Sequence, residues 1–163
     1  MGCKLRIAGI LPESVVDGPG LRYTVFVQGC PHHCPGCHNP QTHDPLGGYV
    51  ADSDDLIAAM REDPLISGLT LSGGEPFCQA EALLPLARAA RAAGLDVIAY
   101  SGYTLEQLLA LAEKEPPVLQ LLRLTDTLID GPYREAERDL SLSFRGSANQ
   151  RIIDLRQIKL PEN

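Results

Sequence analysis

Hydrophobic residues recur along this chain with two different spacings, and these predict alternating strands and helices. Short runs of β-branched, aromatic or aliphatic residues are typical of strands. Residues 38–50 are polar and contain several Gly and Pro residues, so we expect a loop there. The expected strands lie at 4–10, which has the pattern of a short edge strand, and at 22–28, 68–72, 95–100, 127–130 and 150–154.

Four helices are expected between these strands, at residues 53–62, 84–93, 104–114 and 118–124. Pro85 is tolerated best in a first turn, which places the start of the second helix near Leu84. Gly94 suits the C-terminal cap of the same helix. Thr104 and Gln107 have the spacing of a capping box, which opens the third helix.

Alternation of strands and helices indicates an α/β fold with a mostly parallel sheet in a single domain, residues 1–163. The units are too few for a closed eight-fold barrel, so we expect an open, partial (βα) barrel. Parallel strands place their carboxyl ends on one edge of the sheet, where such folds carry their sites. Cys30, Gly73, Ser101 and Asp130 each come at or just after the end of an expected strand, so they should converge.

Composition narrows the classes of function. The net charge is −7 without a basic block, which argues against nucleic acid or anionic membrane as a partner. The sequence contains no long apolar stretch free of charged residues, so no membrane span is predicted. The five cysteines are an odd number with three clustered, which favours a metal site in a reducing, cytoplasmic setting over secreted disulfides.

The candidate metal ligands are Cys30, Cys34 and Cys37, which share one short loop. Thiolates suit both iron–sulfur clusters and zinc. Three cysteines would leave one iron of a [4Fe–4S] cluster open, because such a cluster normally takes four. The alternative is a structural zinc ion with a fourth ligand from one of the four histidines, His32, His33, His38 or His43.

A second segment, Gly73-Gly74-Glu75-Pro76, ends the next strand. Alone it is an ordinary strand-to-helix turn, in which glycines supply unusual backbone angles. Together with the Cys-x3-Cys-x2-Cys loop it resembles the radical S-adenosylmethionine superfamily. The resemblance implies that this turn holds the amino group of S-adenosylmethionine, with the Glu75 carboxylate near that cation.

Further segments narrow the resemblance. Residues 17–22 resemble the entry segment of the activases of glycyl radical enzymes, and residues 144–154 resemble the C-terminal signature of those that act on anaerobic ribonucleoside-triphosphate reductase. Residues 100–103 and 128–131 fit the same pattern. His38 and Glu75 depart from it, because that subfamily more often has an aromatic residue and Asp there, and Cys37-His38-Asn39 is closer to activases of the pyruvate formate-lyase type.

The resemblance implies both chemistry and partners. A [4Fe–4S] cluster would cleave S-adenosylmethionine reductively, and the 5′-deoxyadenosyl radical would take a hydrogen from a glycine of a partner enzyme. That partner would be the large subunit of anaerobic ribonucleotide reductase, or another glycyl radical enzyme. Reduced flavodoxin or ferredoxin would supply the electron. This chemistry needs no acid–base pair and no nucleophile. The alternative from a different class of function is a zinc-stapled binding module without catalytic activity.

The expected cofactor contacts follow from these motifs and from the strand ends. For Ser101 and Asp130, a plain turn residue is an equal alternative. Arg22 is expected to pair with a buried carboxylate rather than with a ligand, whereas Arg145, Asn149 and Arg151 could order the site or meet the partner. Cys3 and Cys78 are not expected to bind metal; each is expected to be a small core or surface residue. The candidate cofactor-binding residues are His38, Ser72, Gly73, Gly74, Glu75, Ser101 and Asp130.

Overall fold

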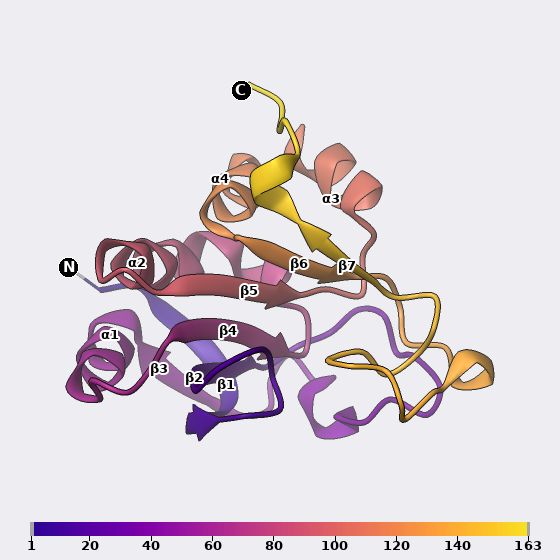
Figure 1. The fold of residues 1–163 in the computed structure, drawn as a ribbon, viewed down its shortest axis with the longest axis horizontal. Helices are drawn as coiled ribbons and strands as arrows, with labels where there is room; N and C mark the ends of the chain where they lie inside the picture. Colours follow the sequence, from indigo (N-terminus) through magenta and orange to yellow (C-terminus); the bar gives the residue numbers. More distant parts are fainter. Residues whose placement is uncertain (1, 163) are drawn as a thin grey trace.

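A mixed seven-stranded sheet forms the frame of the molecule, which a computed structural model describes over residues 2–162 (Figure 1). The strand order is β3-β1-β2-β4-β5-β6-β7. The central strands β2, β4, β5 and β6 pair in parallel, and the outer strands pair antiparallel. The strands are β1 (Lys4–Ser14), β2 (Arg22–Val27), β3 (Tyr49–Asp52), β4 (Gly68–Gly73), β5 (Asp96–Tyr100), β6 (Thr127–Asp130) and β7 (Arg151–Asp154).

The expected α/β fold with a largely parallel sheet is confirmed, but one edge differs from the prediction. β3 lies partly within residues 38–50, which were expected to form a loop, and it pairs with the start of β1. Tyr49 and Val50 are exposed, and Ala51 and Asp52 are only half-buried, so β3 shows no alternation of buried and exposed residues to reveal it. Backbone pairing with β1 defines this strand, and backbone pairing leaves little trace in a sequence.

Four helices connect the strands: α1 (Ser53–Glu62), α2 (Ala80–Ala92), α3 (Leu105–Ala112) and α4 (Pro116–Leu124). The Thr104–Gln107 capping box and the Gly94 cap are confirmed. The start predicted for α2 is wrong, because the helix begins at Ala80 and contains Pro85 in its interior. The free energy gained by burying the apolar face of α2, including Leu83 and Leu86, exceeds the free energy lost with the backbone hydrogen bond that the proline removes.

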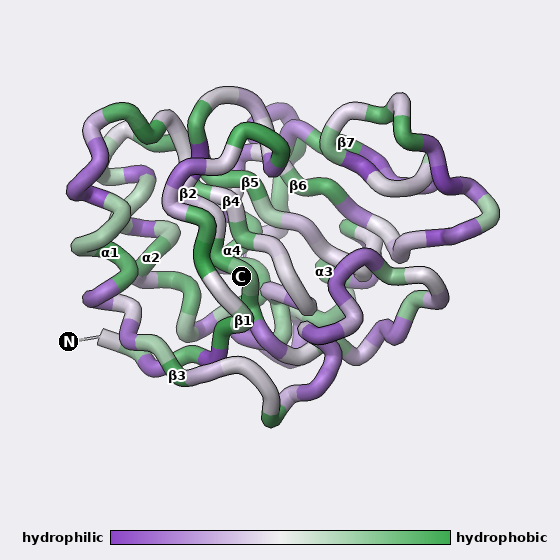
Figure 2. Tube along the Cα trace, turned by 90° about the horizontal axis from the view of Figure 1, so that it is seen from below, coloured by the Kyte–Doolittle hydropathy of each residue, from purple (hydrophilic) through white to green (hydrophobic). Residues whose placement is uncertain are grey.

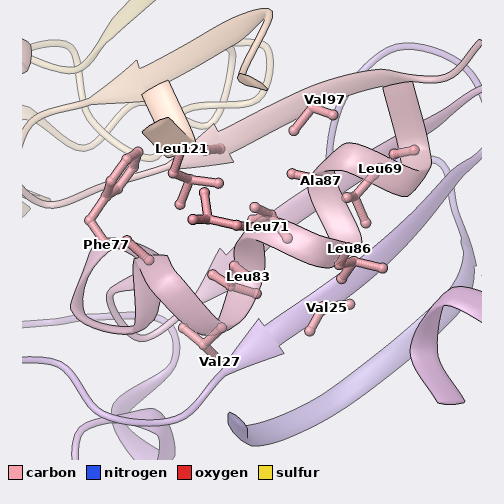
Figure 3. Packing of buried hydrophobic residues seen from close by; sticks show 14 of the residues in the cluster. Val25, Val27, Leu69, Leu71, Phe77, Leu83, Leu86, Ala87, Val97 and Leu121 are labelled. Atoms are coloured by element: carbon pink, nitrogen blue, oxygen red, sulfur yellow. The ribbon is translucent and has the colours of Figure 1, made fainter. Parts of the chain in front are cut away.

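The helices cover one face of the central sheet. Alternate strand residues, such as Val25, Leu69 and Val97, face Leu83 and Ala87 of α2 (Figure 3). All five side chains are completely buried or nearly so. Figure 2 shows hydrophobic residues along α1, α2 and the central strands, and hydrophilic residues in the outer loops. The core therefore lies between these helices and the sheet.

The opposite face of the central strands is polar at one end and forms part of a cavity at the other. Arg22 is completely buried there and donates to Thr70 at 2.6 Å and to the Asp96 carboxylate at 3.0 Å. Arg22 therefore pairs with a carboxylate, as expected, but that carboxylate is partly exposed and not buried. Phe26, Ser72 and Tyr100 follow on the same side of their strands toward the carboxyl edge, where they line the cavity.

Candidate functional site

A cavity of about 390 Å³ lies at the carboxyl edge of the parallel strands. Its volume is within the range of small-molecule sites. Figure 1 shows the arrowheads of β4 and β5 directed toward this side, where residues 28–45 and the orange segment after β6 also lie. Of the predicted site residues, the cavity is lined by Cys30, Cys34, Cys37, His38, Ser72, Gly73, Gly74 and Ser101.

The loop with the three cysteines is held at both of its ends. The N–H of Cys30 donates to the His43 carbonyl at 3.2 Å, and the N–H of Cys37 donates to the Cys34 carbonyl at 3.1 Å. The N–H of Asn39 donates to the Cys37 sulfur at 3.4 Å. Burial raises the pKa of the Cys30 thiol, and hydrogen bonds from the N–H groups of the following histidines oppose that rise.

The Gly73-Gly74 turn brings the end of β4 against the start of the cysteine loop. Gly73 has a φ of +98°, and a Cβ there would overlap the backbone of Val27. A Cβ on Gly74 would overlap the Gly29 carbonyl. The N–H groups of Gly74 and Glu75 donate to the carbonyls of Val27 and Gly29 at 2.9 and 2.8 Å. Both glycines are therefore needed for this close backbone approach.

Glu75 lies beneath the cavity, completely buried, and does not line it. Its Oε1 atom is 2.7 Å from Nε2 of His32 and accepts from the N–H of Gly102 at 2.8 Å. The hydroxyl of Ser101 lies 2.9 Å from both carboxylate oxygens, and the N–H of Phe77 donates to Oε2 at 3.1 Å. One buried carboxylate thus ties together the cysteine loop and the ends of β4 and β5.

Ser101 and Asp130 differ in their relation to the cavity. Ser101 lines it, although its hydroxyl is hydrogen-bonded to Glu75. Asp130 is buried outside the lining and accepts from the N–H of Leu105 at 2.7 Å and from Nε of Arg151 at 3.0 Å. The hydrogen bonds of Arg151 with Asp130 and with Glu106 raise the pKa of its guanidinium. The carboxylate of Asp130 connects the end of β6 with the start of β7 and the start of α3.

Residues 131–150 form a covering segment that closes one side of the cavity. The ring of Tyr133 packs against that of His38 with centroids 4.9 Å apart. A Cβ on Gly36 would overlap the Glu135 carboxylate, and a Cβ on Gly146 would lie 3.6 Å from the His38 ring. The covering segment therefore contacts the cysteine loop directly, although a long stretch of sequence separates them.

The covering segment also supplies cavity-lining residues that sequence reasoning did not single out. Tyr133, Leu140 and Gln150 line the cavity, and so does Phe144, which has a φ of +61°. Phe144 and Gln150 lie within residues 144–154, which resemble a family signature, whereas Tyr133 and Leu140 lie outside that stretch. Arg145 was left open between ordering the site and meeting a partner, and the structure places it in the lining.

The donor set fits an iron–sulfur cluster. Cys30, Cys34 and Cys37 share one short loop and line one cavity, where each thiolate would ligate a different iron. His32, one of the candidate zinc ligands, is instead hydrogen-bonded to Glu75.

Comparisons with known proteins agree with this site. A family model described as a 4Fe-4S single cluster domain matches residues 16–153. An anaerobic ribonucleoside-triphosphate reductase-activating protein from Vibrio cholerae is 39% identical over 86% of this chain and 92% of its own length. Its counterpart from Escherichia coli K12 is 36% identical over 89% and 96%, and that of phage T4 is 33% identical over 88% and 90%.

The fold has a counterpart among solved structures. The crystal structure of QueE from Escherichia coli superposes with a TM-score of 0.50 and 22% identity, over 62% of this chain and 54% of that one. At this identity the match concerns the fold alone. The family model and the curated relatives, by contrast, extend over most of the chain, including the cysteine loop and the covering segment. The chain belongs to the 4Fe-4S single cluster domain family and, within it, to the anaerobic ribonucleoside-triphosphate reductase-activating proteins.

Proposed function

We propose that this chain activates anaerobic ribonucleoside-triphosphate reductase by radical S-adenosylmethionine chemistry, as its relatives' names and its cluster family indicate. The observation that carries the proposal is that the three cysteines and the Gly73-Gly74 turn line one cavity. Neither segment requires the other in a zinc-stapled binding module. In an activase they must meet, because cluster and cofactor have to be in contact.

Each wall of the cavity has a distinct task. Cys30, Cys34 and Cys37 would hold the cluster through three irons, leaving the fourth for S-adenosylmethionine. The N–H groups of Gly74 and Glu75 are already hydrogen-bonded within the protein. An ammonium group donates hydrogen bonds, so it would bind to backbone carbonyl groups of the turn. When bound, the reduced cluster supplies the electron that cleaves the sulfonium and yields the 5′-deoxyadenosyl radical.

The mouth of the cavity suits a polypeptide substrate. Val16 and Leu140 line it and are 70% and 81% exposed, and Val15 beside them is also 70% exposed. These apolar side chains come from the turn between β1 and β2 and from the covering segment. A glycine-bearing loop of the reductase could pack between them and bring its Cα to the radical.

The setting of the reaction is part of the same proposal. All five cysteines are free among the residues described, and a reducing cytoplasm would keep them so. The described residues contain no helix that is long and apolar enough to cross a membrane. We infer that a reduced flavodoxin or ferredoxin supplies the electron.

An anaerobic preparation tests the proposal. The purified protein should hold four irons and, with dithionite and S-adenosylmethionine, release 5′-deoxyadenosine. Cys30→Ala, Cys34→Ala or Cys37→Ala should abolish that release, since each removes a cluster ligand. Cys78→Ala is the matched control, because Cys78 lies outside the cavity lining.

Two results would contradict the proposal. One is a colourless protein with one zinc and no iron; the other is full release of 5′-deoxyadenosine by Cys34→Ala. The partner is tested separately, by mixing the reduced activase with an anaerobic ribonucleotide reductase. A glycyl radical signal should appear on the reductase, whereas a signal on a pyruvate formate-lyase alone would identify the other partner class.

A further inference from the structure

Arg145 stands out among the residues that line the cavity. It is the only Lys or Arg in the lining among the residues described, and Asp17 is the only Asp or Glu. S-adenosylmethionine brings a carboxylate into this space, beside three cysteine thiolates. A carboxylate removed from water needs a paired cation. The lining therefore offers one permanent cation for one buried anion.

The guanidinium of Arg145 has an unused edge. Its Nη1 donates to the Gln150 carbonyl at 3.1 Å, whereas its Nε is buried and has no hydrogen-bond partner. Within residues 2–162 the side chain forms no ion pair. Hydrogen bonds from Ser141, and after them the positive charge of Arg145, lower the pKa of Asp139, but this carboxylate is exposed and forms no ion pair with Arg145. The free Nε edge is the one that binds a carboxylate through two parallel hydrogen bonds.

The position of Arg145 is at the cluster end of the cavity. Its neighbour Gly146 packs beside the ring of His38, which directly follows Cys37 in the sequence. The Gly73-Gly74 turn lines the same cavity. In S-adenosylmethionine the carboxylate and the amino group are attached to the same carbon, so a cofactor with its amino group at that turn presents its carboxylate at this end.

We propose that Arg145 pairs with the carboxylate of S-adenosylmethionine, through the Nε edge of its guanidinium. This inference rests on the proposed function, and it assigns to the covering segment a part in binding the cofactor rather than the reductase. The neighbouring hydroxyl of Tyr133 is also buried without a partner, so the same wall has a second group available to the ligand.

Equilibrium dialysis of the cluster-loaded protein, without oxygen and without a reductant, tests this pairing. The probes are S-adenosylmethionine and its decarboxylated analogue. Arg145→Gln should weaken binding of S-adenosylmethionine by about 10- to 100-fold, the range for loss of a charged hydrogen-bonded pair. The affinity of Arg145→Lys for S-adenosylmethionine should fall between those of the natural protein and Arg145→Gln, because lysine keeps the positive charge but lacks the planar pair of N–H donors. Arg138→Gln, exposed in the same segment and outside the lining, should bind like the natural protein.

The analogue distinguishes a direct contact from a loss of structure. Without a carboxylate to pair, the natural protein and Arg145→Gln should bind the analogue with the same affinity. The inference would be overturned if Arg145→Gln bound both ligands more weakly to the same extent, or if its affinity for S-adenosylmethionine were unchanged. A change confined to the affinity for the reductase would overturn it as well, in favour of a docking role.

Two further outcomes are kept apart. If the natural protein binds neither four irons nor S-adenosylmethionine, the proposed function itself fails. If Arg145→Gln does not fold, as judged by circular dichroism and iron content, Arg145→Lys with both probes decides. Its preference for S-adenosylmethionine over the analogue should be smaller than that of the natural protein, and an undiminished preference would contradict the pairing.

Discussion

At the scale of single residues, Glu75 has a different environment from the one that its motif predicts. The resemblance to the radical S-adenosylmethionine superfamily implied that its carboxylate lies near the amino group of the cofactor. In the structure both oxygens face protein donors from three segments, and the side chain does not line the cavity. Gly73 and Gly74 of the same segment do line the cavity, but the direction of the Glu75 side chain depends on which distant donors surround it.

This arrangement predicts a large effect on stability. Glu75→Ala should destabilise the cluster-free protein by about 3–5 kcal/mol, because it leaves several buried donors without an acceptor. Urea unfolding under reducing conditions measures the change. Glu13→Ala, at an exposed carboxylate in β1, is the control and should alter stability by less than about 0.5 kcal/mol. A loss below about 1 kcal/mol for Glu75→Ala would show that the carboxylate is not a structural centre.

At the scale of elements, the central strands, the edge strand β7 and the helix ends followed local rules, whereas the edge strand β3 and the start of α2 did not. Buried strands reveal themselves by their apolar residues, and caps by their residue types. β3 is exposed and exists through pairing with β1. The first turn of α2 forms because Leu83 and its neighbours are buried against the sheet, which a proline-based rule does not include.

The end of α2 offers a clean test of a local rule. Gly94 has a φ of +80° and open space around its Cα, so Gly94→Ala adds conformational strain without a clash. It should cost about 1 kcal/mol of unfolding free energy. Gly9→Ala also meets no neighbour and lacks the positive φ, so it should change stability little. Thermal unfolding of both variants compares them, and equal losses would contradict the assignment to backbone strain.

At the scale of the whole molecule, the cavity is assembled from segments that are distant in sequence. The cysteine loop, the ends of β4 and β5, and the covering segment each contribute one wall. The covering segment has almost no regular structure of its own and depends on contacts with His38 and Gly36. Its order should therefore respond to whatever fills the cavity.

Hydrogen exchange can follow that response. Binding of S-adenosylmethionine to the cluster-loaded protein should slow exchange in residues 131–150 and in the cysteine loop, because ligand contacts join the two walls. Amides of β4 and β5, already buried in the sheet, should exchange at an unchanged rate. Protection spread evenly over the molecule, or absent from residues 131–150, would show that the covering segment does not contact the ligand.

The sequence by itself determined the chemistry and the plan of the fold. Cys30, Cys34 and Cys37 could be proposed as cluster ligands, and the alternation of apolar strands and helices indicated that they lie at the carboxyl edge of the sheet, because residue type and spacing are local properties. Only the tertiary structure decided that Glu75 turns inward to His32 and Ser101, and that Arg145 faces the cavity with an unpaired Nε. The direction of each side chain depends on donors and acceptors that folding brings from distant parts of the chain, and no local pattern contains them.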